Sequence, residues 1–138
     1  MEIDFEWTEH YLIGVDEIDV QHKRLLLIMK SAFALKDQDL MSAPLNKILM
    51  ELEKYAKFHF KSEEMLMKMY SYPEYEEQKA EHKKIYSELK KGISLVKTEN
   101  DISGLLYLLV EWFVGHTRDK DRHMGSYINS ARSQMTLT

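Results

Sequence analysis

Apolar residues recur at intervals of three and four along four stretches of the chain, which is the period of amphipathic helices. The stretches run from about residue 16 or 19 to 36, from about 42 to 70, from about 74 to 97, and from about 102 to 116. Short polar breaks separate them. Helices joined by such short links pack in alternating directions. The pattern therefore predicts an all-α fold, an antiparallel up-down-up-down four-helix bundle.

Residues 1–15 show no steady hydrophobic period, so we expect an irregular N-terminal arm. Phe5 and Trp7 are the side chains expected to anchor this arm on the bundle. After the fourth stretch the sequence becomes polar. We expect a polar tail there, from which Tyr127 and Ile128 pack back against the helices.

Composition narrows the class of protein. A net charge of −4 argues against nucleic acid as the main partner, because phosphate binding needs a basic face. The absence of cysteine excludes disulfides, thiolate metal sites and cysteine nucleophiles. The acidic start is no signal peptide, and the longest apolar run, residues 105–110, is too short to span a bilayer. We expect one domain, residues 1–138, in the cytoplasm and without a membrane partner.

Each predicted helix places one histidine on its apolar stripe, namely His22, His59, His82 and His116. Glu63 follows His59 by four residues, and side chains at that spacing lie on one helical face, roughly 5–6 Å apart at Cβ. A single histidine on such a stripe is usually structural. In an antiparallel bundle, however, the four histidines can lie at one level, with Glu63 in the same layer.

A layer of this kind buries several imidazoles and at least one carboxylate, and no Lys or Arg lies on the stripes to pair with it. An unpaired buried charge destabilises a fold strongly, and a cation with two or more charges removes that penalty. The pattern therefore predicts a metal site. Imidazole with carboxylate suits iron, zinc, copper or manganese. Four histidines with two carboxylates are too many for one zinc ion and suit two irons bridged by carboxylates.

Spacing excludes one kind of di-iron site and leaves one ligand open. A ferritin-like site needs Glu-x-x-His twice, and the residues three positions before the four histidines are Asp19, Ala56, Lys79 and Phe113. For the second carboxylate, ordinary helical geometry after His116 favours Asp119. Asp121 lies five residues on, about 140° around an α-helix.

Taken together, these residues resemble the hemerythrin family, specifically its bacterial members. The resemblance covers nearly the whole chain, and the combined spacing is highly specific. The matching segments are Trp7-Thr8-Glu9, Val15-Asp16-Glu17-Ile18-Asp19-Val20-Gln21-His22, His59-x-x-x-Glu63, His82 of the third helix, and Trp112-x-x-x-His116-x-x-x-x-Asp121.

The resemblance implies a hemerythrin-like domain with a non-haem di-iron centre, in which an oxo or hydroxo group bridges two iron ions. It implies two histidine pairs on separate irons and two bridging carboxylates, namely His22 with His59, His82 with His116, and Glu63 with Asp121. It thereby selects Asp121 over Asp119. Many family members bind O₂ reversibly at one iron. The implied function is O₂ storage, delivery or sensing rather than catalysis, with O₂ or a similar small diatomic or anionic molecule as the ligand.

Two positions depart from the family pattern. The family motif in the third helix is HxxxH, and Gln78 stands here in place of the first histidine. Gln78 can ligate through its amide oxygen, leave a water or an open position, or act as a structural core amide. Leu25, Phe60 and Trp112 match the apolar O₂ pocket. Thr117 stands where an apolar pocket residue is usual, and we expect its hydroxyl to make the pocket wetter, which favours oxidation over reversible release.

These departures keep two alternatives to O₂ binding open. The first is peroxide or nitric-oxide chemistry at a more open iron, which Gln78 and Thr117 favour. The second is a regulatory metal-binding module whose metal is mostly structural. The first alternative predicts turnover of peroxide or nitric oxide. The second predicts that removal of the metal lowers the stability of the fold.

Overall fold

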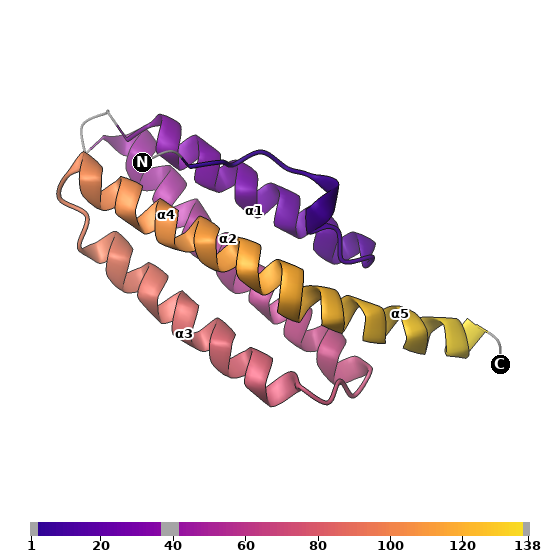
Figure 1. Ribbon diagram of the computed structural model, residues 1–138. Helices are drawn as coiled ribbons and strands as arrows, with labels where there is room; N and C mark the ends of the chain where they lie inside the picture. The colour runs from indigo at the N-terminus through magenta and orange to yellow at the C-terminus, as the bar shows by residue number, and fades with distance from the viewer. Residues whose placement is uncertain (1–2, 37–41, 137–138) are drawn as a thin grey trace.

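The computed structural model describes residues 3–36 and 42–136 of the 138-residue chain. Within those residues, helices α1 to α4 follow one another along the chain, and α4 continues into α5 (Figure 1). In chain order the helices span Asp16–Ala34, Ala43–Met69, Tyr75–Ser94, Glu99–His116 and Arg122–Thr136. No helix of the described residues is long and apolar enough to cross a membrane.

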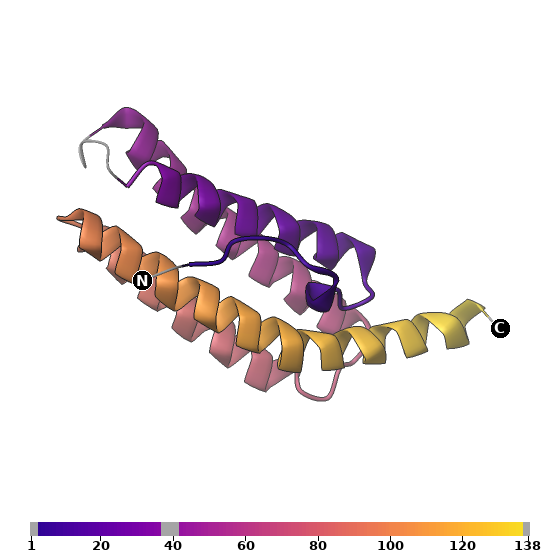
Figure 2. The same ribbon diagram turned by 45° about the horizontal axis from the view of Figure 1, so that its top comes forward.

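The helices form a closed bundle, because each packs against its neighbour in sequence and α1 also packs against α4 (Figures 1 and 2). Short links reverse the chain direction between consecutive helices, so neighbours are antiparallel. The all-α, up-down-up-down bundle that the periodicity predicts is confirmed.

Side-chain caps mark where two helices begin. Ser42 accepts a hydrogen bond from the Leu45 amide at 3.4 Å at the start of α2. At the start of α4, the Asp101 amide donates to the Thr98 hydroxyl at 3.2 Å, and the Thr98 amide donates to the Asp101 carboxylate at 3.0 Å. With this capping box, α4 begins at Glu99, three residues before the start near residue 102 that the apolar stripe indicates. The stripe misses this first turn because its residues are polar.

The N-terminal arm is extended except for a short 3-10 helix, Glu9–Tyr11. Phe5 is buried and packs against Phe33 at 5.3 Å between ring centroids. The arm turns at Gly14, whose φ of 87° is unfavourable for residues with a Cβ. The Asp19 carboxylate then accepts hydrogen bonds from the Ile13 and Gly14 amides at 2.8 and 3.2 Å, which attaches the arm to α1.

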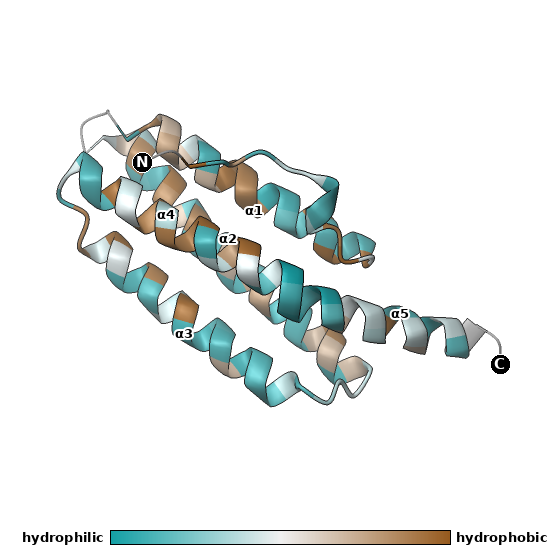
Figure 3. Ribbon diagram, in the orientation of Figure 1, coloured by the Kyte–Doolittle hydropathy of each residue, from teal (hydrophilic) through white to brown (hydrophobic). Residues whose placement is uncertain are grey.

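Two apolar clusters fill the bundle, one on each side of a polar layer. The larger cluster contains Leu25, Phe60 and Phe113, and the smaller contains Met67 and Met124. The buried histidine of each of the helices α1 to α4 belongs to this polar layer. Figure 3 shows the change in α4, where a mostly apolar helix gives way to a polar stretch at its junction with α5. The polar layer is therefore enclosed by apolar packing along the bundle axis.

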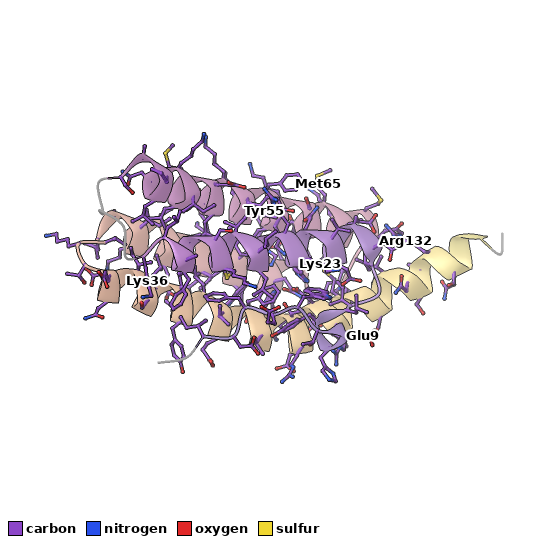
Figure 4. All side chains as sticks on the ribbon, turned by 90° about the horizontal axis from the view of Figure 1, so that it is seen from above. Glu9, Lys23, Lys36, Tyr55, Met65 and Arg132 are labelled. Carbon is purple, nitrogen blue, oxygen red and sulfur yellow. The ribbon has the colours of Figure 1, made fainter. Side chains whose placement is uncertain are left out.

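The polar segment after His116 is helical and continues as α5 (Figure 1), and the expectation that Tyr127 and Ile128 pack back against the bundle is confirmed. Met124 and Ile128 lie on one face of α5, four residues apart, and are fully buried in the smaller cluster. Two such residues are too few to reveal a helix in a polar sequence. Arg132 of α5 pairs with Glu17 of α1 at 3.0 Å, and Figure 4 shows its side chain near that end of the bundle.

Candidate metal centre

Six polar side chains converge in the layer between the two apolar clusters, and all six are at most 6% exposed. They come from every helix of the bundle and from the turn between α4 and α5, namely His22 of α1, His59 and Glu63 of α2, His82 of α3, His116 of α4, and Asp121. The structure thus brings together every residue that the resemblance implies as a ligand.

Glu63 lies between histidines of three helices, with its two carboxylate oxygens facing different ways. Its Oε1 lies 2.5 Å from His59 Nε2 and 3.4 Å from His22 Nε2. Its Oε2 lies 3.6 Å from His82 Nε2. One carboxylate therefore faces both the His22–His59 pair and the opposite side of the layer.

Asp121 shows the same arrangement from the other end of the layer. Its Oδ2 lies 3.1 Å from His22 Nε2, and its Oδ1 lies 3.1 Å from His116 Nε2. Both carboxylates therefore stand between the same two groups of imidazoles. This is the geometry in which a carboxylate can bind one cation with each oxygen.

A π-helical turn, Thr117–Asp121, places Asp121 on this face. In an α-helix a residue five positions after His116 points about 140° away. Hydrogen bonds from i to i+5 widen the turn, so that residues five apart lie nearly above one another. Asp119, which ordinary spacing favours, is exposed and belongs to neither group of candidate ligands in the described residues.

The outer ring nitrogens of His59 and His82 have hydrogen-bond partners that orient the imidazoles, and that of His116 lies near a carboxylate oxygen. His59 Nδ1 lies 2.9 Å from Gln21 Oε1, and His82 Nδ1 lies 2.9 Å from Glu64 Oε2. His116 Nδ1 lies 3.2 Å from Glu81 Oε2. A proton on each Nδ1 leaves Nε2 free to face the layer, as metal-binding histidines require.

Sequence reasoning missed these three partners, Gln21, Glu64 and Glu81. Each follows or precedes a candidate ligand directly in the sequence, yet it contacts a histidine of a different helix. Helical spacing relates residues within one helix only, so it contains no signal for such contacts.

Aromatic rings hold the imidazoles from the apolar side. Phe60 stacks on His82 and Trp112 stacks on His116, each with ring centroids 4.4 Å apart and planes 16° apart. Phe113 meets His22 edge-on at 5.3 Å. These contacts restrict ring rotation and keep water from the layer.

Burial and the two carboxylates oppose each other in setting the pKa values of the imidazoles. Burial lowers the pKa of His22, but the hydrogen bonds that its ring donates to the Asp121 and Glu63 carboxylates outweigh burial and raise that pKa to about 10. Burial likewise lowers the pKa of His82, and the contacts with Glu63 and Glu64 raise it to about 9. For His59 burial is the larger effect, and its pKa is lowered. Without metal, protons on the imidazoles therefore balance the buried carboxylates, and a metal ion must displace them.

Several buried ligand atoms of the layer have no hydrogen-bond partner, namely Glu63 Oε2, His82 Nε2, His116 Nε2 and Asp121 Oδ1. Buried polar atoms are rarely left unpaired without a reason. Two overlapping groups of four side chains each place one ligand atom per residue within 4.8 Å of the others, and both groups include Glu63 and Asp121. The donor set and its unpartnered atoms therefore fit cations at two neighbouring positions, with the two carboxylates shared between them.

Gln78 lies one helical turn before His82 on the buried face of α3 and is 1% exposed. Its amide nitrogen donates a hydrogen bond to the Lys120 carbonyl at 3.2 Å, in the π-helical turn directly before Asp121. Its amide oxygen is buried without a hydrogen-bond partner. Gln78 therefore connects α3 to the turn that positions Asp121, and its oxygen is the atom left for a further contact.

An apolar cavity of about 20 Å³ lies beside the layer, lined by Leu25, Phe60, Trp112 and further apolar side chains from all four helices. This volume is about that of one small molecule, and no polar partner is present to hold a water there. Thr117 is buried but does not line this cavity, so the expectation that its hydroxyl makes the O₂ pocket wetter stays a prediction. Trp112 and His116 are four residues apart and lie on one face of α4. Thr117 follows His116 directly and therefore points to a different side of the helix.

Comparison with known proteins agrees with the geometry. Residues 13–128 match the family model described as the hemerythrin HHE cation binding domain. The chain is 28% identical over 124 residues to a bacteriohemerythrin of Clostridium acetobutylicum, covering 86% of this chain and 96% of that protein. It is 30% identical over 120 residues to a myohemerythrin of Theromyzon tessulatum, covering 85% and 88%.

A bacteriohemerythrin of Stenotrophomonas maltophilia is 26% identical to this chain over 133 residues, covering 93% of this chain and 84% of that protein. The family model and these relatives span the four-helix bundle and the layer of histidines and carboxylates within it. The chain therefore belongs to the hemerythrin family.

Proposed function

We propose that the protein holds two iron ions in the polar layer and binds O₂ reversibly there, for storage, delivery or sensing. The observation that supports this most directly is the position of Glu63 and Asp121, each of which faces imidazoles on both sides of the layer. Two carboxylates in this position place negative charge against two neighbouring cation positions at once.

The proposed ligands follow the two groups of side chains. His22 and His59 bind one iron, and His82 and His116 bind the other. Glu63 and Asp121 bridge the two irons through separate oxygens. Gln21, Glu64 and Glu81 hold the outer nitrogens and thereby orient three of the imidazoles. The bound irons would supply the electrons that hold O₂.

The surrounding side chains favour reversible binding. The cavity beside the layer is lined by apolar groups, which admit a small apolar gas and exclude water. Exclusion of water limits proton delivery to bound O₂, and protonation would promote its loss as a reduced species. Phe60 and Trp112, which line the cavity and stack on two candidate ligands, connect the gas site to the metal site.

Iron content and visible spectra test this proposal together. The iron-loaded protein is reduced without air, exposed to O₂ and then purged with argon. We expect two irons per chain and a visible absorption band that appears with O₂ and disappears on purging. One iron per chain, or irreversible oxidation on first exposure, would contradict the proposal.

A second candidate function is reduction of peroxide or nitric oxide, which Gln78 favours. Because Gln78 replaces a histidine of the family pattern, the His82–His116 side of the layer has one imidazole fewer than that pattern. The amide nitrogen of Gln78 already donates a hydrogen bond to the Lys120 carbonyl. An open position on that iron would admit a reactive ligand. Turnover of peroxide or nitric oxide that falls after Gln78→His would support this candidate, and equal rates in both proteins would remove it.

A further inference from the structure

A surface groove of about 200 Å³ between α2 and α3 lies directly over one histidine of the metal layer. Four lysines line it, Lys57 and Lys61 from α2 and Lys79 and Lys83 from α3. The chain as a whole has a net charge of −4, so this patch is opposite in sign to the rest of the molecule. It forms a local positive surface where the metal layer comes close to solvent.

The groove lysines are available to a partner. All four are exposed, and none forms an ion pair with a carboxylate among the described residues. The ammonium of Lys79 lies 5.7 Å from the centre of the Tyr75 ring, a contact that leaves its charge unneutralised. Unpaired lysines clustered around one groove attract a negatively charged surface, since their potentials add.

The floor of the groove is the way into the metal layer. Phe60 and His82 both line it, and their rings are stacked at 4.4 Å. Glu64 also lines the groove. Its side chain is 20% exposed, and its Oε2 lies 2.9 Å from Nδ1 of His82, which is 2% exposed. A partner seated in the groove would therefore contact the outer hydrogen bond of a candidate iron ligand.

We propose that this lysine groove docks an acidic redox protein that donates electrons to the di-iron centre. The proposal rests on the proposed function, because an O₂ carrier is inactivated whenever bound O₂ leaves with electrons and both irons become ferric. The donor loses one electron and one ferric ion gains it, so two such transfers restore the ferrous pair. Electron-transfer encounters use small, charged, short-lived interfaces, which fits four lysines around a shallow groove.

The test uses the iron-loaded protein and an acidic plant-type [2Fe–2S] ferredoxin as the probe. The groove variant combines Lys61→Glu with Lys83→Glu. The matched control combines Lys47→Glu with Lys91→Glu, which are exposed lysines of the same two helices outside the groove. Both variants change the net charge equally, so a difference between them reports the position of the charge.

Stopped-flow reduction of the ferric protein gives the first result. We expect the second-order rate constant with reduced ferredoxin to fall about tenfold or more in the groove variant and less than about twofold in the control. Added salt should slow the wild-type reaction and have little effect on the groove variant. Equal losses in the two variants, or no loss in either, overturn the proposal.

Titration of oxidised ferredoxin into the oxidised protein gives a second result, in which no electron moves and no iron is needed. Weaker binding in the groove variant alone supports the docking surface, even for a preparation whose lack of iron overturns the proposed function. Binding without reduction overturns the assignment of an electron donor. Anionic lipid vesicles that bind the wild type but not the groove variant, with no ferredoxin binding, would assign the groove to a membrane and also overturn the proposal.

Discussion

At the scale of single residues, the metal centre depends on carboxylates whose two oxygens face different imidazoles. Glu63 shows this most clearly, because it is fully buried and lies against histidines of α1, α2 and α3. Its pKa is well below the usual glutamate value, since the charge of His59 and hydrogen bonds from the three imidazoles outweigh burial. The buried charge is thus held in place for a cation.

Replacing Glu63 by glutamine keeps the shape of this side chain and removes its charge. We expect the metal content after dialysis to fall from two irons per chain to fewer than one, because an amide cannot bridge two cations. Glu64→Gln is the control, since it weakens only the orientation of His82, and affinity should fall about 10- to 100-fold. Two irons retained in Glu63→Gln would show that this residue is no bridge.

At the scale of secondary-structure elements, the π-helical turn between α4 and α5 decides which aspartate enters the layer. The turn adds one residue to a helical repeat, and α5 continues on the far side with its apolar face toward the smaller cluster. Gln78 binds the Lys120 carbonyl in this turn, which couples α3 to its geometry.

Deleting Lys120 removes the extra residue of the turn, so the aspartate then follows His116 by four residues and lies about 40° from it around an ordinary α-helix. We expect the deletion variant to keep bound iron with little change in helix content, measured by metal analysis and circular dichroism. Asp121→Asn removes the charge at unchanged length and should lose iron, whereas Asp119→Asn is the control and should keep it. Iron retained in Asp121→Asn, or lost in Asp119→Asn, would mean that the turn does not select Asp121 as a ligand.

The capping box at the start of α4 offers a second test on this scale. Thr98→Ala removes the hydroxyl that accepts from the Asp101 amide, and we expect the free energy of unfolding to fall by about 1 kcal/mol. Thr98→Ser keeps the hydroxyl and should lose much less. Chemical denaturation of the metal-free proteins measures both. Equal losses would assign the effect to packing rather than to the cap.

At the scale of the whole molecule, folding and metal binding share one polar layer. Because each of α1 to α4 contributes a candidate ligand, a metal bound in the layer would stabilise the complete bundle over the unfolded chain. The two apolar clusters on either side of the layer can hold the bundle together without metal. The protein is therefore expected to fold in both forms and to melt higher when loaded.

The pH dependence of stability should differ between the two forms. In the metal-free protein, the pKa values of His22 and His82 are raised from 6.5 to about 10 and about 9. The stability that they contribute is fully present below pH 6.5 and is lost as the pH rises through 9 and 10. Metal binding requires neutral imidazoles, so the stabilisation by iron grows over the same interval.

Thermal unfolding at pH 6.5, 8 and 9.5 checks this expectation. The melting temperature of the metal-free protein should fall with rising pH, and the gap to the loaded protein should widen. The variant His22→Gln removes one raised pKa and should flatten part of the slope. A metal-free protein whose melting temperature rises over this range would contradict the assigned protonation of the layer.

The sequence by itself determined the features that depend on local periodicity. A helix repeats every 3.6 residues, so the stripes alone place four histidines and Glu63 on inward faces and predict the bundle. The structure agrees with these positions, since all five side chains are buried in one layer. Leu25, Phe60 and Trp112, which the resemblance assigns to an apolar pocket, line a common cavity.

The tertiary structure decided the features that depend on contacts between helices. Ordinary spacing favours Asp119, and the π-helical turn places Asp121 in the layer instead, because α5 must also bury Met124 and Ile128. The partners of the outer histidine nitrogens, the hydrogen bond of Gln78 and the position of Thr117 outside the cavity likewise arise between elements. A periodic pattern reports which face of a helix is buried. Only the packed bundle sets which atoms of two different helices lie within a hydrogen bond of each other.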